Sequence, residues 1–104
     1  MKILKYELKI TDRQTIKVNG SKAHILSVAE QDGKLMMWAM VSAESGFSQD
    51  PYLDVFIIGT GNELPNNLVP HDGPFSNNVP FVGTVVMSNG LVWHVFAETI
   101  SVGV

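Results

Sequence analysis

The sequence FVGTVVMSNGLVWHVFAE, residues 81–98, decides the fold class of this chain. Within it, two runs rich in valine and aromatic residues flank Asn89-Gly90. Asn-Gly favours a two-residue hairpin loop of type I′, because both central residues of that turn take a positive φ. The stretch therefore predicts two antiparallel strands that are joined at Asn89-Gly90.

Pairing through that loop predicts which side chains lie together in the hairpin. It sets Val86 opposite Trp93 and Gly83 opposite Phe96, where the aromatic ring would cover the backbone of a strand glycine. Because strand side chains alternate between faces, one face would carry Val86, Trp93 and Val95, and the other Val85, Met87, Val92 and Phe96. Both faces are mostly apolar, which is typical of a central hairpin in a sandwich or a closed barrel.

Five further segments have the periodicity or composition of strands: residues 3–10, 14–18, 23–31, 34–41 and 52–60. Asp32-Gly33 joins two of them as a second type I′ candidate, and the predicted pairs are Val28 with Met37, Leu26 with Ala39, Ser27 with Trp38, and Ile25 with Met40. Residues 34–41 also suit a helix, but their short length and the adjacent Asp-Gly favour a strand. We therefore predict an all-β protein, a small antiparallel β-sandwich or barrel of six to seven strands in a single domain over residues 1–104.

Composition excludes several classes of protein. The chain has 104 residues and no cysteine, which excludes disulfides, thiolate zinc sites and cysteine nucleophiles. The net charge of −3 argues against a general nucleic-acid binder, because such proteins carry a basic surface for phosphates. The first residues lack the apolar region of a signal peptide, and no segment has the length of a membrane span. We therefore expect a soluble, acidic protein without direct nucleic-acid or membrane partners.

A long polar segment separates the fifth strand from the hairpin. Residues 62–80 are rich in Asn, Pro and Asp, and we predict a long irregular loop that is disordered, covers a sheet edge or serves the function. Phenylalanines isolated in polar loops are candidate anchors for a protein partner, and Phe75 is the stronger of the two. Trp38 and Trp93 are expected in the core. The candidate binding residues of the loops are Phe47, Phe75, His71 and Asp72.

The groups with catalytic potential carry no complete motif. None of the three histidines has metal-ligand spacing, and His94 is the best candidate because its apolar neighbours would desolvate it. Gly59-Thr60-Gly61 lacks the third glycine and the following helix of a nucleotide loop, so its glycines are expected to give the backbone a bulge or a sharp exit from the strand. We expect no enzyme activity, no catalytic residue, no metal and no cofactor. Gly59, Thr60, Gly61 and His94 remain candidate binding residues.

Several short blocks along nearly the whole chain carry a family resemblance. They are Lys5-Tyr6-Glu7-Leu8 with Ile10-Thr11, Gln14-Thr15-Ile16, Ile25-Leu26-Ser27-Val28, Trp38-Ala39 with Val41, Ile58-Gly59-Thr60-Gly61, Gly83-Thr84, and Leu91-Val92 with His94-Val95-Phe96. In this order they resemble a family of small uncharacterised proteins encoded by bacteriophages and prophages. The departures are Asn19-Gly20-Ser21, Leu35-Met36-Met37 and the longer 62–80 segment. The resemblance implies a phage gene product in a bacterial host cytoplasm or in a virion, and it implies no functional residues.

These features favour a small phage-encoded accessory protein that binds a host or phage protein. It would inhibit a host factor or an antiviral defence complex such as a CRISPR effector, and an acidic surface would suit the occlusion of a nucleic-acid channel. The alternative is a virion component or a carbohydrate-contacting module, with apolar hairpin faces buried between copies in a homo-oligomer. A small enzyme around His94 or His71 is the least favoured alternative.

Overall fold

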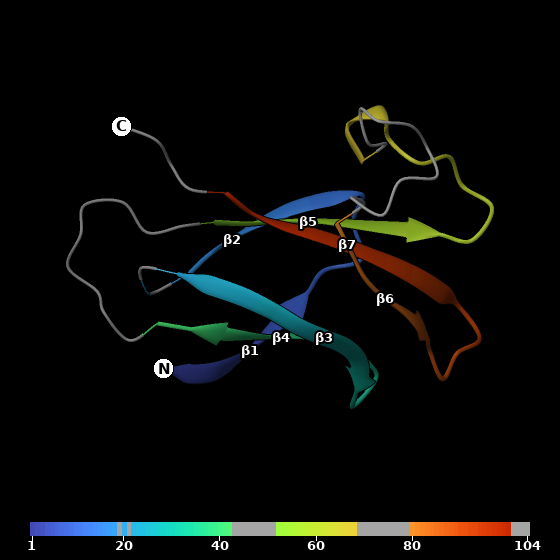
Figure 1. Cartoon of the computed structure of the whole chain (residues 1–104). Helices are drawn as coiled ribbons and strands as arrows, with labels where there is room; N and C mark the ends of the chain where they lie inside the picture. Colours follow the sequence, from blue (N-terminus) through green and yellow to red (C-terminus); the bar gives the residue numbers. More distant parts are fainter. Residues whose placement is uncertain (19, 21, 43–51, 69–79, 101–104) are drawn as a thin grey trace.

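Two antiparallel sheets face each other across one apolar layer (Figure 1). The computed structural model describes residues 1–18, 20, 22–42, 52–68 and 80–100. The elements in these residues are β1 (Lys2–Leu8), β2 (Arg13–Lys17), β3 (Ala23–Gln31), β4 (Lys34–Val41), β5 (Tyr52–Gly59), the 3-10 helix η1 (Asn66–Leu68), β6 (Phe81–Val86) and β7 (Val92–Ile100). The sheets have the orders β1-β4-β3 and β2-β5-β7-β6. The prediction of an all-β fold of six to seven antiparallel strands is confirmed.

The turn between β3 and β4 is the predicted one. Asp32 and Gly33 have φ values of 53° and 77°, the positive values that a type I′ turn needs. Residues 34–41 form a strand and not a helix. Near the turn the predicted register is also confirmed, and its pairs are Val28 with Met37 and Ser27 with Trp38.

Further from the turn, a bulge at Leu26 makes the predicted register wrong. Ile25 pairs with Ala39 instead of Met40, and Leu26 is 42% exposed. With strict alternation Ile25 and Val28 would point to opposite faces, since they are three positions apart. The extra residue lets both of them pack against the core.

The hairpin between β6 and β7 has a three-residue loop, so the predicted type I′ turn at Asn89-Gly90 is wrong. Gly90 has a φ of 91°, whereas Asn89 does not have a positive φ. The Gly90 N–H donates to Met87 O (2.9 Å) and the Met87 N–H donates to Leu91 O (2.8 Å), as in a type I turn followed by a left-handed glycine. The Asn89 carboxamide oxygen accepts the Leu91 N–H (3.0 Å), which stabilises this longer loop.

The longer loop shifts the register of the hairpin by one residue. Val85 pairs with Trp93 and faces the core, while Val86 points outward and is 70% exposed. A second bulge at Val82 then places Phe81 opposite Phe96, and their ring centroids lie 5.3 Å apart in an edge-to-face contact. The predicted grouping of hairpin side chains on the two faces and the predicted Gly83–Phe96 pair are therefore wrong. A shift of one residue moves the side chains of one strand to the opposite face relative to the other strand.

The strands contribute one face each to the apolar layer between the sheets. The central strands supply most of it, with Leu35, Met37, Ala39 and Val41 from β4 and Leu53, Val55 and Ile57 from β5. Trp93 packs against this layer, as predicted. Trp38 does not: it takes an even position on β4, whose odd positions face inward, and lies half-buried on the outward face. Its prediction as a core residue is wrong.

β5 is buried on both faces because η1 covers the outward side of its sheet (Figure 1). There Phe56, Ile58 and Phe96 form a second apolar cluster with Leu68, which is 1% exposed. The first part of the predicted 62–80 loop therefore covers a sheet face and not a sheet edge. Residues 69–79 of that loop lie outside the described residues.

An ion pair lies beside this second cluster. Asp54 is the one buried charged side chain in the described ranges, and both of its oxygens accept hydrogen bonds from Arg13, from Nε (2.9 Å) and from Nη2 (2.8 Å). The hydrogen bond, and then the charge of Asp54, raise the pKa of Arg13. The Arg13 guanidinium also lies 5.0 Å from the centroid of the Phe56 ring. The pair joins the edge strand β2 to β5 at its outward face.

The sheets contact each other directly along β3 and β6. The Ser88 N–H donates to Glu30 Oε2 (2.6 Å) just beyond the end of β6. At Gly83 a Cβ would lie 3.1 Å from Val28 Cγ2, a distance that side chains rarely take. Glycine at this position therefore permits the close approach of the two sheets.

Tyr6→Phe tests the packing of the core. The Tyr6 hydroxyl is buried and has no hydrogen-bond partner within the described part of the chain, a situation that costs about 1–3 kcal/mol. We expect the free energy of unfolding of the variant, measured by urea denaturation, to equal that of the wild type or to exceed it by about 1 kcal/mol. Tyr52→Phe, at an exposed position, is the matched control and is expected to be neutral. A loss of more than about 1 kcal/mol in Tyr6→Phe alone would contradict an unsatisfied hydroxyl.

The same variant makes a prediction about pH. Burial raises the pKa of Tyr6 above its ordinary value of 10.0, so the unfolded chain loses this proton at a lower pH than the folded protein. Above about pH 10 the folded state then binds more protons, and stability falls as pH rises. We expect the wild type to lose stability relative to Tyr6→Phe between about pH 9 and pH 11. Parallel pH profiles of the two proteins would count against this.

Candidate functional site

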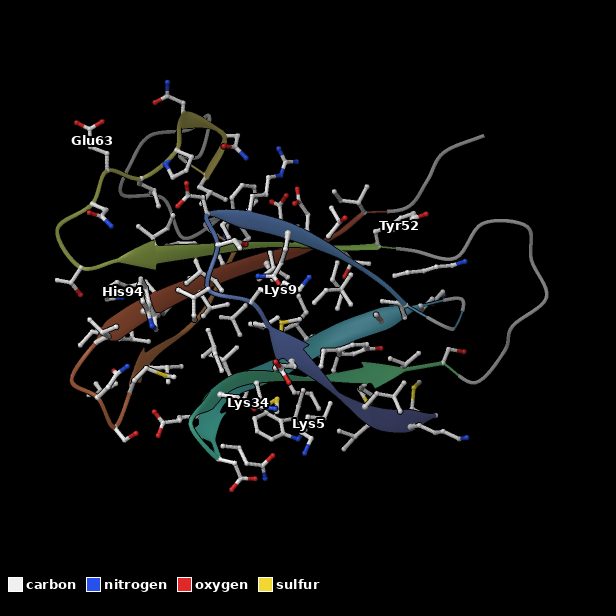
Figure 2. The ribbon with its side chains drawn as sticks, turned by 180° about the vertical axis from the view of Figure 1, so that it is seen from behind. Lys5, Lys9, Lys34, Tyr52, Glu63 and His94 are labelled. Atoms are coloured by element: carbon white, nitrogen blue, oxygen red, sulfur yellow. The ribbon has the colours of Figure 1, made fainter. Side chains whose placement is uncertain are left out.

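The structure brings together four of the eight candidate binding residues. Gly59 ends β5, Thr60 and Gly61 follow it, and His94 lies beside them on β7, at the end of the sheet opposite Tyr52 (Figure 2). The other four, which are Phe47, Phe75, His71 and Asp72, lie outside the described residues. The candidate site therefore begins where the four-stranded sheet ends.

A four-residue turn after β5 positions the Thr60 side chain. The Asn62 N–H donates to Gly59 O (3.1 Å), and Gly61 has a φ of 91°, as the third residue of a type II turn requires. The chain thus makes the sharp exit from the strand that its glycines predicted. Gly59 has a second role, because a Cβ there would lie 2.9 Å from Asn62 Nδ2 and 3.3 Å from Trp93 Cζ3. Its missing side chain leaves room for both groups.

His94 is held between two threonines. Thr60 Oγ1 lies 2.7 Å from its Nε2, and Thr84 Oγ1 lies 2.9 Å from its Nδ1. A hydroxyl both donates and accepts, so the imidazole keeps both partners in either neutral tautomer and in its charged form. The network joins β6, β7 and the turn after β5.

The geometry of this network suits positioning better than acid–base chemistry. The Thr60–His94 distance is that of a nucleophile and its general base. In a catalytic triad, however, a carboxylate stabilises the charged imidazole, and here the neutral Thr84 hydroxyl takes that place. The described residues also contain no group of three or more His, Cys, Asp or Glu that would hold a metal ion. The arrangement fixes the Thr60 hydroxyl at the wall of a cavity.

That cavity lies between the turn and the β6–β7 loop. Its volume is about 350 Å³, and we call it the Trp93 cavity, lined by Gly59, Thr60, Asn62, Gly90, Leu91, Val92 and Trp93. A separate groove of about 300 Å³ lies between the first residues of β3 and β6, where both bulged positions, Leu26 and Val82, line it. Each depression occurs where strand pairing ends or is interrupted.

A further surface, which the sequence analysis missed, is the outward face of the three-stranded sheet. We call it the β4 face: Met36, Trp38 and Met40, with Ile3, Lys5 and Glu7 of β1 and His24, Ser27 and Ala29 of β3. Trp38 lies at its centre, and Ile3 is 63% exposed. None of the described elements covers it, in contrast to the outward face of the other sheet (Figure 1). Its signal in the sequence was that positions 36, 38 and 40 are as apolar as the odd positions between 35 and 41.

Long polar side chains of β1 and β3 flank the apolar row of β4, and one hydrogen bond between them crosses β4. Lys5 Nζ donates to Gln31 Oε1 (2.7 Å), and Lys34 Nζ lies 3.4 Å from Glu7 Oε1. Figure 2 shows both lysines on this sheet, away from His94. The Lys5 charge has no carboxylate partner within the described ranges. All seven Lys and Arg residues of the chain precede residue 35. The Trp93 cavity, in contrast, draws its walls from a part of the sequence without Lys or Arg.

Comparison with known proteins identifies a family. The model of a domain of unknown function, DUF7352, matches residues 1–102. No curated protein and no solved structure matches the chain. No helix in the described segments is long and apolar enough to cross a membrane.

Thr60→Val tests whether the His94 network holds the turn. The change removes the hydroxyl beside His94 Nε2, so we expect unfolding to require about 1 kcal/mol less and the His94 ring resonances to move in NMR spectra. Thr15→Val on β2 is the matched control, because the Thr15 hydroxyl is exposed and makes no hydrogen bond within the described residues. Equal stability of the two variants with unmoved His94 resonances would show that the network does not hold the turn.

Proposed function

The chain belongs to the DUF7352 family, and we propose that it is a phage- or prophage-encoded accessory protein that acts by binding another protein through the β4 face. The observation that carries the proposal is Trp38, half-buried at the centre of an apolar row on β4 that no described element covers. Blocks such as Lys5-Tyr6-Glu7-Leu8 and Ile58-Gly59-Thr60-Gly61, which resemble phage and prophage proteins, support the proposed origin.

The β4 face has the composition of a protein-binding surface. An aromatic anchor at the centre and charged residues at the rim are the usual arrangement of binding hot spots. Met36 and Met40 flank the anchor, and methionine adapts its shape to different partner surfaces. A sheet that packs on one side normally carries polar residues on its other side, so this apolar row is not explained by the stability of the monomer.

The partner that we propose is a host protein in the bacterial cytoplasm, a cellular factor or part of an antiviral defence complex. Its binding surface would be apolar and bordered by a carboxylate, because Lys5 offers an unpaired positive charge at the rim. An acidic surface is not part of the proposed interface, since the exposed carboxylates of the described residues come from separate elements. They are Glu7, Asp12, Asp32, Glu63 and Glu98.

Trp38→Ala is the direct test. We expect a partner captured from host lysate to bind this variant about 30-fold or more weakly than the wild type, since an aromatic hot spot contributes about 2 kcal/mol or more. Val86→Ala, which removes an exposed apolar side chain from the other sheet, is the matched control and is expected to bind normally. Circular dichroism and thermal melts establish that both variants fold.

Other outcomes identify different functions. A partner that binds both variants equally would move the interface away from the β4 face. If no partner is captured and light scattering shows dimers of the wild type but monomers of Trp38→Ala, the face joins copies of the chain, as in a virion component. Lys5→Gln, compared with Lys17→Gln on β2, tests the rim, and only the former is expected to lower the affinity and its dependence on salt.

A further inference from the structure

The Trp93 cavity has an aromatic wall with a free hydrogen-bond donor. The Trp93 indole is half-buried, and Cζ3 lies beside the backbone of Gly59. Its Nε1–H makes no hydrogen bond within the described residues and is not among their buried polar atoms, so it remains open to solvent or to a ligand. The side chain therefore offers the cavity an apolar ring and one unused donor.

Asn62 places a second unused polar group at the same wall. Its carboxamide makes no hydrogen bond within the described part of the chain, and its Nδ2 lies close to Gly59. A carboxamide carries two donor hydrogens and an acceptor oxygen. Thr60 adds a hydroxyl that His94 holds in place at 2.7 Å. One side of the cavity thus carries hydrogen-bond donors and acceptors, which are the indole N–H, the carboxamide and the hydroxyl.

The charge of the walls favours a neutral ligand over an anion. The lining residues are all uncharged, and no Lys or Arg occurs anywhere in residues 35–104. A phosphate or carboxylate ligand would find no positive charge on these walls to replace its hydration. A purely apolar ligand would leave the Asn62 carboxamide and the Trp93 N–H without partners.

We propose that the Trp93 cavity binds a neutral saccharide. The ring of a sugar has apolar C–H faces and a rim of hydroxyl groups, which match an indole beside a carboxamide and a threonine hydroxyl. A volume of about 350 Å³ is at the lower end of the range of small-ligand pockets and accommodates one sugar ring. Gly59 is essential in this arrangement, because a larger residue would displace both Trp93 and Asn62. The site is separate from the β4 face and does not depend on the proposed protein partner.

Tryptophan fluorescence gives a direct test, because the chain has two tryptophans. In a Trp38→Phe background only Trp93 reports, and the probes are glucose, galactose, mannose, N-acetylglucosamine and their short oligomers. We expect at least one of them to change the Trp93 emission with a saturable curve. Asn62→Ala is expected to weaken this binding about tenfold, the effect of one hydrogen bond of about 1.4 kcal/mol. Asn66→Ala, an exposed asparagine of η1 outside the cavity, is the matched control and is expected to bind normally.

Three results would overturn the proposal. One is the absence of any saturable response from the neutral saccharides in a folded protein. Another is binding that Asn62→Ala and Gly59→Ala leave unchanged, which would place the sugar elsewhere. The third is tighter binding of glucose 6-phosphate or N-acetylneuraminic acid than of the neutral sugars, which would show that the ligand is an anion.

Discussion

The apolar layer between the two sheets is the constraint on which the rest of the structure depends. Each buried aliphatic side chain in it contributes about 1.5–3 kcal/mol, and every strand must keep its apolar face turned toward it. The two bulges follow from this requirement. The bulge at Leu26 keeps Ile25 and Val28 on the same side of β3. The bulge at Val82 shifts the register between β6 and β7 by one residue. Local irregularities of pairing are thus consequences of a global packing demand.

The ends of the strands position the Trp93 cavity. Where the ladder stops, backbone and side-chain polar groups are no longer used in pairing, and depressions form between the elements. The Trp93 cavity lies between the turn that ends β5 and the loop that joins β6 to β7. His94 connects this turn to β6 through Thr60 and Thr84, so the edge of the cavity is held by the sheet itself. A site held in this way keeps its geometry before a ligand arrives.

The two outward faces of the sandwich have different roles in the structure. On the four-stranded sheet, Leu68 and the Arg13–Asp54 pair cover the aromatic residues, which gives β5 burial on both sides. On the three-stranded sheet, the described residues leave Met36, Trp38 and Met40 with only polar side chains of β1 and β3 beside and across them. The same apolar composition therefore stabilises the monomer on one face and remains available to a partner on the other.

The sequence by itself determined the all-β class, the strand segments and the turn at Asp32-Gly33, because alternation and turn chemistry are local properties. It also indicated Gly59, Thr60, Gly61 and His94, although not that Thr60 and His94 would lie in contact. Only the tertiary structure decided the three-residue loop at Gly90, the bulges and the outward position of Trp38. In a strand that is apolar on both sides, either face satisfies the local pattern, and a register shift of one residue exchanges them. The choice is made by what lies across from the strand, and this depends on contacts between distant segments that a local pattern does not show.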